Sequence, residues 1–392
     1  MIIDYSFNTK IARENTSCVK YDRRSEVFGS SSVTPLWVAD MDFATPAFIR
    51  EALQQRIDHP ILGYTFLPSG AVDAAIGWVY RRHGWKIESN WICLCPGIVP
   101  AINFAILANS KVGEKAVIQP PVYTPFFAAI EDHKRVVVEN PLLENEGCYT
   151  MDLNHLEQQF KEGVKLLILS NPHNPTGRVY TKNELEQVAS LASKYNVVII
   201  SDEIHCDIVM PHQKHIPIAS LSEDAANRTI TLIAPSKTFN LAGLATGLAI
   251  IPNETLRAKF NSILNSLHLS MGNLFGNIAM QAAYTSGDEW VDGLNAYLYN
   301  NFQTINTILK SSNAPFRSQT PEGTYLAWID FREFNLPQQE LNRILIETAN
   351  VGLSDGTIYG KQGIGFQRLN AACPKSVIEN AVARIAESFS KA

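Results

Sequence analysis

The sequence predicts an α/β protein in which a large, doubly wound domain with a mainly parallel sheet is followed by a smaller α+β domain. Three observations predict this fold. The middle of the chain alternates short apolar runs with amphipathic helices, most of the runs are apolar throughout, and this character changes near residue 285. Strands that are buried on both faces of a parallel sheet are continuously apolar. Alternating strands and helices are typical of doubly wound sheets.

Six short runs rich in Val, Ile and Leu are the predicted strands of the large sheet. Between two of them, Thr181–Tyr195 has an apolar face at helical spacing, and Thr181 with Glu184 forms a capping box at its start. Before the first of the six, the run Trp91–Cys95 leads into an apolar helix predicted over Pro100–Ala108. The six predicted strands are Ala116–Gln119, Val136–Glu139, Leu166–Leu169, Val197–Ser201, Thr229–Ile233 and Gly247–Ile251.

The smaller domain is predicted where strands become fewer and helices gather, after Thr285–Gly287. The first clear helix of the chain is predicted to begin with Thr45 as N-cap and Pro46 at its first position. We therefore expect an N-terminal arm (1–45) that joins the small domain, a large domain (46–284) and a small C-terminal domain (285–392). The elements expected in the last part are helices Glu289–Lys310 and Gln338–Thr348, strands Tyr325–Asp330 and Gly365–Leu369, and a closing helix from Lys375.

Composition and charge indicate which partners and which cellular compartment to expect. The 392 residues carry 33 basic and 38 acidic side chains, a net charge of −5 that gives no reason to expect nucleic acid or a membrane surface as partner. The six cysteines form no disulfide framework, which favours a reducing compartment. Met1–Phe7 does not have the pattern of a signal peptide, and no apolar run approaches the ~20 residues of a membrane span. We expect a cytoplasmic protein.

Three separated segments place polar residues at the ends of predicted strands. Asn171–Arg178 follows one strand, Ser201–His205 ends the next, and Ala234–Thr238 follows the one after. Ligands of open α/β sheets bind at the carboxyl ends of the strands, so these segments predict one shared site.

An aspartate and a lysine in such a site fit the chemistry of pyridoxal 5′-phosphate (PLP). The amine of Lys237 would form a Schiff base, and the carboxylate of Asp202 would keep the pyridine nitrogen protonated so that the ring accepts electrons. Asn174 could bind the ring hydroxyl oxygen. Each residue taken alone has an ordinary explanation, because such an aspartate often caps a helix and Asn-Pro often forms a turn.

These segments resemble a known superfamily. Asn-Pro-His-Asn-Pro-Thr-Gly-Arg from Asn171, Ser-Asp-Glu-Ile-His from Ser201 and Ser-Lys-Thr-Phe-Asn-Leu-Ala-Gly from Ser236 resemble the fold-type I PLP enzymes, which include the aminotransferases. Trp37–Phe43 and Gly365–Asn370 more specifically resemble the MalY/PatB family of cystathionine β-lyases. The resemblance runs from about residue 20 to the C-terminus. It implies a fold-type I PLP-dependent transferase fold, PLP as cofactor and a homodimer with shared active sites.

Around the cofactor ring, the resemblance implies a role for five residues. Lys237 is the imine lysine and the proton shuttle, and Asp202 pairs with the pyridine nitrogen. Asn174 contacts the ring hydroxyl, and His205 stands where aminotransferases usually have a tyrosine that touches the same oxygen. Tyr123 stacks on the ring, although an aromatic beside Pro120 and Pro121 is also an ordinary core residue.

The cofactor phosphate is expected at the start of the apolar helix near residue 100. Free N–H groups at a helix start bind phosphate, and the resemblance implies this role for Gly97, Ile98 and Val99. It adds Ser236 from the lysine segment and Tyr64 from the neighbouring subunit. Two positions depart from the aminotransferase pattern. Ala245 stands where many aminotransferases have a phosphate-binding arginine, and Ala234 where they commonly have serine.

The substrate carboxylate is expected to bind Arg368. A guanidinium can hold a carboxylate with two hydrogen bonds, and an arginine inside an apolar strand needs an anion. The resemblance implies that Asn174, Ala39 and Tyr64 complete the contacts to the substrate.

The implied activity is β-elimination on an L-cysteine thioether such as cystathionine, which gives pyruvate, ammonia and a thiol such as homocysteine. The alternative within the superfamily is an aminotransferase. Two further alternatives come from other classes. A metal site could use the cluster at His205, Cys206 and Asp207 with His212 and His215, although Cys93 and Cys95 lack a second cysteine pair. A non-enzymatic regulator is disfavoured because no DNA-binding domain fits before residue 45. We expect no metal.

Overall fold

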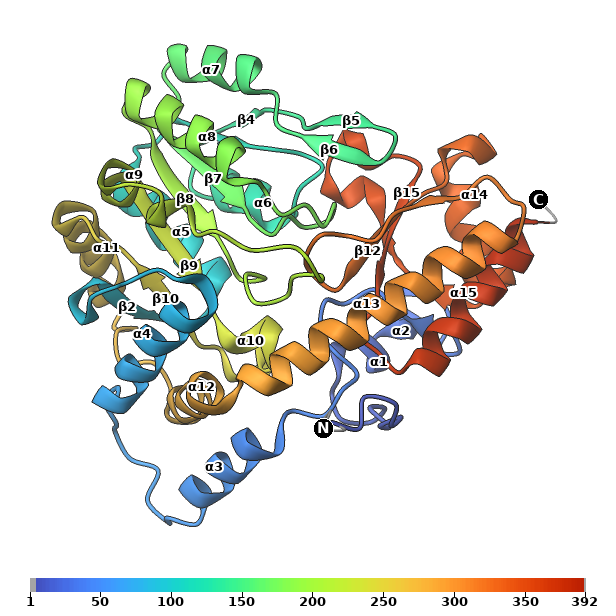
Figure 1. Ribbon diagram of the computed structural model, residues 1–392, viewed down its shortest axis with the longest axis horizontal. Coiled ribbons are helices and arrows are strands. Elements are labelled where there is room, and N and C mark those ends of the chain that lie inside the picture. The colour runs from blue at the N-terminus through green and yellow to red at the C-terminus, as the bar shows by residue number, and fades with distance from the viewer. Residues whose placement is uncertain (1–4, 391–392) are drawn as a thin grey trace.

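The fold is described here from a computed structural model that places residues 5–390. The first four residues of the predicted arm lie outside the described residues. A seven-stranded sheet forms the centre of the large part of the molecule (Figure 1). In spatial order its strands are β2 (Ile92–Cys95), β10 (Gly247–Ile250), β9 (Thr229–Ile233), β8 (Val198–Asp202), β7 (Leu166–Ser170), β3 (Lys115–Ile118) and β4 (Val136–Glu139).

Most strands of this sheet are parallel, as predicted. Only β10 runs antiparallel to its two neighbours, β2 and β9. Alternate residues of β7 enter different cores. Ile168 packs in the cluster that contains α5, whereas Leu167 and Leu169 pack in the cluster that contains α8. Burial on both faces explains why these strands are continuously apolar.

Helices cover both faces of the large sheet (Figure 1). The predicted capping box is present at the start of α8, where Thr181 and Glu184 exchange hydrogen bonds. No helix within residues 5–390 is both long enough and apolar enough to cross a membrane. The helices are α1 (Val19–Asp22), α2 (Arg24–Phe28), α3 (Ala47–Ile57), α4 (Ser69–His83), α5 (Ile98–Asn109), α6 (Pro125–Glu131), α7 (Leu153–Lys161), α8 (Lys182–Tyr195), α9 (Glu223–Arg228), α10 (Pro235–Thr238), α11 (Glu254–Ser266), α12 (Leu274–Ser286), α13 (Asp288–Ser311), α14 (Gln338–Arg343) and α15 (Lys375–Phe389).

The C-terminal part has its own antiparallel sheet, with α13 and α15 packed along each other beside it (Figure 1). The N-terminal arm joins this part through a short parallel pairing of β1 (Thr34–Pro35) with β13 (Val351–Gly352). The division into an arm and two domains stays a prediction. In spatial order the sheet consists of β11 (Arg317–Ser318), β12 (Leu326–Asp330), β15 (Phe366–Asn370) and β14 (Ser354–Asp355).

Two helix starts differ from the prediction. Thr45 is not the N-cap of the first long helix, because Pro46 has an extended backbone and takes that position before α3. The apolar helix predicted from Pro100 begins two residues earlier, so Ile98 and Val99 already belong to α5.

Gly287 separates α12 from α13, and a Cβ atom there would lie 2.3 Å from the ring of Phe239. This close approach explains a glycine between two long helices.

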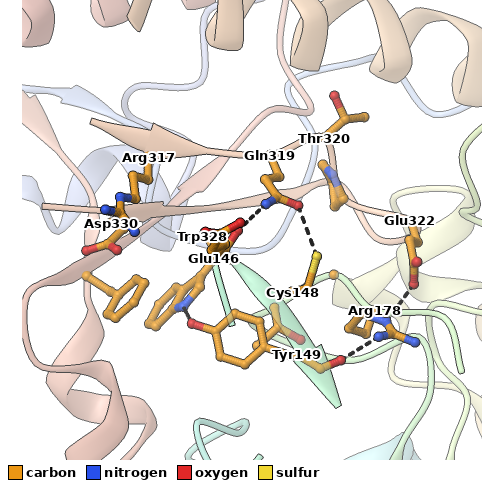
Figure 2. Close-up of a pocket in the computed structure, with 15 residues that line it drawn as sticks. Glu146, Cys148, Tyr149, Arg178, Arg317, Gln319, Thr320, Glu322, Trp328 and Asp330 are labelled. Atoms are coloured by element: carbon orange, nitrogen blue, oxygen red, sulfur yellow. Dashed lines mark hydrogen bonds and ion pairs between the residues drawn. The ribbon is translucent and has the colours of Figure 1, made fainter. Parts of the chain in front are cut away.

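A small hollow of about 100 Å³ marks the seam between the large part and the C-terminal part (Figure 2). The hairpin of β5 (Leu143–Asn145) and β6 (Cys148–Thr150) lies on one side of it, and β12 lies on the other. Trp328 Nε1 donates to Tyr149 Oη at 3.0 Å, and Arg178 Nε donates to Glu322 Oε2 at 2.8 Å. Arg178 lies four residues after Asn174, so the seam holds the Asn174 loop against the C-terminal part.

Candidate active site

The register of the large sheet brings the three predicted segments together. Ser170 pairs with Asp202 and Asp202 pairs with Leu232, so β7, β8 and β9 end side by side. The chain continues from these ends into the Asn174 loop, the turn that holds His205 and the short helix that holds Lys237. All three line one cavity of about 720 Å³.

Lys237 lies on α10, which starts with Pro235 at its first position. Its Nζ donates a hydrogen bond of 2.6 Å to the carbonyl oxygen of Ala39. Burial and the nearby charge of Arg368 lower the pKa of Lys237 to about 8, against the opposing effect of Asp40 and Asp202. A buried amine with a lowered pKa is more often neutral, and a neutral amine is the nucleophile that a Schiff base requires.

Asp202 ends β8 and is almost completely buried. Burial raises the pKa of this carboxyl to about 7, although the backbone N–H of Ile204 donates to its Oδ1 at 3.1 Å. A cationic partner in the cavity would return this pKa toward its usual range. The site is therefore suited to a protonated ring nitrogen.

Asn174, His205 and Tyr123 lie around the same cavity. Burial and the charges of Lys237 and Arg368 hold the pKa of His205 well below its usual range, so the ring is neutral. Its Nδ1 has no hydrogen-bond partner in the described part of the chain, which leaves a buried polar atom available. Burial also raises the pKa of the half-buried Tyr123 phenol, which keeps this aromatic ring protonated and uncharged.

Arg368 is central to β15 and is only 5% exposed. Its guanidinium donates to Asn174 Oδ1 at 3.1 Å, to the carbonyl oxygen of Trp37 at 2.7 Å and to Ser354 Oγ at 3.3 Å. Among residues 5–390 it forms no ion pair with an acidic side chain, and its Nε has no partner. A buried charge without a counterion is costly. The arrangement therefore favours an anionic ligand at this end of the cavity.

The opposite side of the cavity contains the start of α5. Gly97 precedes the helix with a φ of 127°, a conformation that favours glycine, and Ile98 and Val99 are the first helical residues. Free backbone N–H groups at this helix start can bind a phosphate. Ser236 and Ala245 line the same region. Ala245 offers no charge, and Ala234 precedes α10 as its N-cap.

Tyr64 does not lie in this cavity. Its side chain is fully exposed and borders a separate hollow with Phe66 and Leu274. Within one chain, the structure thus brings together every predicted site residue except this one. Those that line the cavity are Ala39, Gly97, Ile98, Val99, Tyr123, Asn174, Asp202, His205, Ser236, Lys237 and Arg368.

The sequence reasoning missed the part of the wall that the N-terminal arm supplies. Arg13, Cys18, Val19 and Asp40 line the cavity. Arg13 forms a two-pronged ion pair with Asp40, with contacts of 2.6 and 3.1 Å. The arm is largely irregular over these residues, so no periodic pattern could have placed them.

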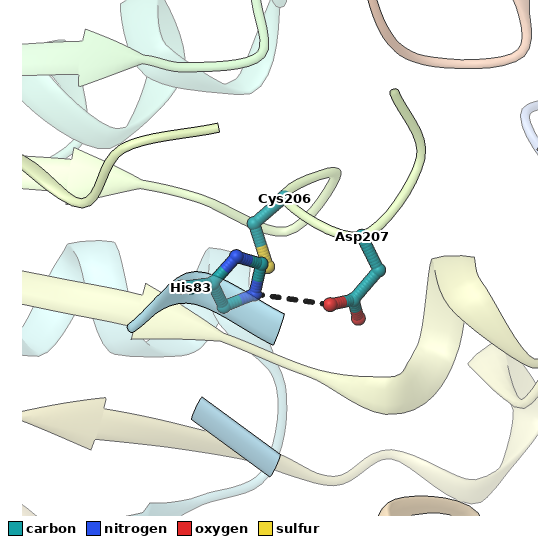
Figure 3. Close-up of side chains that lie close together, drawn as sticks. All are labelled: His83, Cys206 and Asp207. Carbon is teal, nitrogen blue, oxygen red and sulfur yellow. Dashed lines mark hydrogen bonds and ion pairs between the residues drawn. The ribbon is translucent and has the colours of Figure 1, made fainter. Parts of the chain in front are cut away.

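The metal alternative receives little support from the geometry. His83, Cys206 and Asp207 lie close together (Figure 3), and none of them lines the cavity. However, the Asp207 carboxylate already accepts hydrogen bonds from Trp78, His83 and Thr238. His215, which the alternative also used, is paired with Glu203 at 2.7 Å. The Asp207 carboxylate and Nε2 of His215 thus already have hydrogen-bond partners within the protein.

Comparison with known proteins shows the family of the chain. The sequence matches the aminotransferase class I and II family over residues 31–385. It is 40% identical to cystathionine beta-lyase PatB of Bacillus subtilis (strain 168) across 98% of this chain and 100% of the relative. It is 35% identical to protein MalY of Escherichia coli (strain K12) across 97% of both. A crystal structure of the PLP-bound C-S lyase from Staphylococcus hominis is 31% identical and has a TM-score of 0.92, across 99% of this chain and 98% of that one. The predicted fold and the resemblance to the MalY/PatB family are confirmed.

Proposed function

The chain belongs to the aminotransferase class I and II family. From its similarity to cystathionine beta-lyase PatB, we propose that it is a PLP-dependent carbon–sulfur β-lyase. It cleaves an L-cysteine thioether such as cystathionine by α,β-elimination and gives pyruvate, ammonia and a thiol such as homocysteine. The meeting of Lys237, Asp202 and Arg368 in one cavity carries the PLP-dependent chemistry, and the similarity to cystathionine beta-lyase PatB favours elimination.

The residues of the cavity fit PLP. Lys237 would hold it through an imine, and Asp202 would pair with the ring nitrogen. His205 and Asn174 would lie at the ring hydroxyl, and Tyr123 would stack on the ring. Ser236 and the start of α5 would hold the phosphate. Support comes from the unpartnered His205 Nδ1 and from the pKa of Asp202, which burial raises to about 7. When bound, PLP accepts the electron pair that remains on the substrate Cα after a proton leaves.

The chain's own residues orient the substrate and move the proton. Arg368 binds the α-carboxylate. Asn174, Ala39 and Tyr64 of the partner subunit lie beside it. This contact fixes the Cα–H bond toward Lys237, whose released amine removes the proton. The same amine is then placed to protonate the departing thiolate. The cavity walls limit access of bulk water while the carbon–sulfur bond breaks.

The aminotransferase alternative uses the same cavity but a different second step. It requires the proton from Cα to be delivered to the cofactor, and it then requires a keto acid to complete the cycle. The named relatives at 40% and 35% identity favour the lyase. The two reactions separate in a simple assay, since a lyase releases pyruvate from a cysteine thioether when no keto acid is present.

Asp202→Asn is expected to retain PLP and lose turnover. The amide has nearly the same shape, but it does not stabilise a proton on the ring nitrogen. We expect kcat to fall about 10²-fold or more, the range usual for proton-transfer groups, with cofactor content measured on the same sample. Asp152→Asn, at a helix cap outside the cavity, is the matched control. Full turnover by a PLP-loaded Asp202→Asn protein would show that the carboxylate is not the ring partner.

We also propose that the working form is a homodimer in which Tyr64 completes the partner's site. Support comes from exposed apolar side chains in the same segment, which a second copy could cover. They are Ile57, Ile61, Leu62 and Phe66, and Tyr64 itself borders a hollow with Leu274 and Ile278 of α12.

Mixed dimers test this arrangement. Tyr64→Ala and Lys237→Ala are each expected to be nearly inactive. After the two proteins are unfolded and refolded together in equal amounts, about a quarter of the wild-type activity should return. Half of the randomly assembled dimers are then hybrids, and each hybrid has one intact site out of two. If each site belonged to a single chain, mixing would restore nothing, and an active monomer in sedimentation would refute the proposal.

A cytoplasmic location is part of the proposal. All six cysteines are free, and Cys93, Cys95 and Cys206 are among the buried ones. Free thiols are usual in a reducing compartment.

A further inference from the structure

Behind the cavity, the carboxylate of Asp207 is buried and has three side-chain donors. Trp78 Nε1 and His83 Nε2 both bind its Oδ1, at 3.1 and 3.0 Å, and Thr238 Oγ1 donates to its Oδ2 at 2.8 Å. Figure 3 shows the His83 ring facing this carboxylate. The backbone carbonyl of Asp207 also accepts a hydrogen bond from Asn295 of α13. Asp207 thus connects α4 and α13 with the residues behind the site.

The position of this carboxylate relates it to the cofactor residues. Asp207 lies two residues after His205, and Thr238 directly follows Lys237. The Thr238–Asp207 hydrogen bond therefore joins the turn after β8 to α10. Because α10 has only four residues, its own backbone hydrogen bonds hold it weakly. An anchor from outside the helix is needed to fix where the Lys237 side chain begins.

The anchor is charged. Burial alone would raise the pKa of Asp207, but hydrogen bonds from His83 and Thr238 and the charge of Arg82 lower it below the ordinary value. Other ionisable groups near the carboxylate are Cys206 and Tyr284, whose pKa values burial raises well above their usual range, so both are neutral. His215 packs edge-on against His83 and is paired with Glu203. A hydrogen bond to an ionised acceptor is stronger than one between neutral groups.

We propose that Asp207 is a positioning residue for Lys237, which it holds in place through Thr238 from behind the cavity. The proposal rests on the proposed function in one respect, that Lys237 binds the cofactor. Asp207 itself does not line the cavity. A displacement of about 1 Å at the reacting amine can cost about 10²-fold in rate, so the anchor affects imine formation and proton transfer but not binding of the α-carboxylate at Arg368.

A pair of conservative substitutions tests the bond itself. Thr238→Val keeps the shape and loses the hydroxyl, whereas Thr238→Ser keeps the hydroxyl. The first readout is the rate at which cofactor-free protein forms its imine with PLP, followed by absorbance without any amino acid. We expect Thr238→Val to slow imine formation and reduce kcat about 10-fold or more, the loss typical for a hydrogen bond to a charged group, with KM nearly unchanged. Thr238→Ser should stay within about 2-fold of wild type.

The matched control is Thr229→Val. Thr229 is equally buried at the start of β9, and its hydroxyl donates to the carbonyl oxygen of Ala225, outside the cavity. It should lower the melting temperature without slowing imine formation. A merely structural role for Thr238 predicts the same behaviour for Thr238→Val, and that result would overturn the proposal.

Asp207→Asn provides an independent measurement should Thr238→Val not fold. If the two residues act through one bond, Asp207→Asn should slow imine formation by itself, and the double variant should be no slower than the more affected single variant. Losses that multiply, or a normal rate in Asp207→Asn, would contradict the proposal. Imine formation by the wild type without cleavage of any thioether would refute the lyase function and leave the positioning role intact. A wild type that forms no imine at Lys237 would refute both the lyase function and the positioning role of Asp207.

Discussion

Lys237→Ala is expected to abolish turnover and to remove the covalent attachment of PLP. The residue has two tasks, since it holds the cofactor and moves the Cα proton. Loss of the proton transfer alone should reduce kcat about 10²- to 10⁴-fold. Borohydride reduction of the wild type should fix PLP to the peptide that contains Lys237, as seen by mass spectrometry.

Lys194→Ala is the matched control for this labelling. Lys194 is exposed and paired with Glu157 at 2.7 Å, away from the cavity, so its loss should change neither the label nor turnover. Equal labelling of wild type and Lys237→Ala, with the label on another lysine, would show that Lys237 is not the attachment point.

Arg368→Lys is expected to lower kcat/KM for every amino-acid substrate. Lysine keeps the charge but cannot make the two parallel hydrogen bonds of a guanidinium. A hydrogen bond to a charged group contributes about 1.5–3 kcal/mol, so loss of one should lower kcat/KM about 10- to 10²-fold. The cofactor should remain bound, because Arg368 lies at the substrate end of the cavity.

Arg384→Lys is the control for the Arg368 substitution. Arg384 is also partly enclosed and donates to the carbonyl oxygens of Ala349 and Asn350 in the C-terminal part, outside the cavity. It should change the melting temperature more than the kinetics. If Arg368→Lys behaved in the same way, with lower stability and near-normal kcat/KM, Arg368 would be a structural residue and not the carboxylate site.

The parts of the fold that the sequence predicts well are those with a strong physical signature. Every residue of β7 and β9 is buried, and β7 is apolar at all positions but its last. Polar segments follow both strands. The direction of β10 leaves no such mark, since an antiparallel strand in the middle of a covered sheet is as apolar as its parallel neighbours.

The parts of the site that the sequence does not predict depend on contacts between distant segments. Arg13 is held at the cavity by its ion pairs with Asp40 and Asp42. Because the arm is irregular here, no helical or strand periodicity in the sequence predicts where this side chain lies. His83 and Asp207 are 124 residues apart and meet because α4 packs behind the site. Both are ordinary polar residues in the sequence, and only the tertiary structure shows that they are buried together.

The proposed lyase activity is tested by the product balance of the purified, PLP-loaded protein with L-cystathionine and no added keto acid. A β-lyase has to release pyruvate, ammonia and homocysteine in equal amounts over many turnovers, because the elimination returns Lys237 and its cofactor to the starting state. We expect this result for the wild type and its loss in Lys237→Ala. If pyruvate and thiol failed to form, and if the amino group was instead transferred only after a keto acid was added, the protein would be an aminotransferase and not a β-lyase.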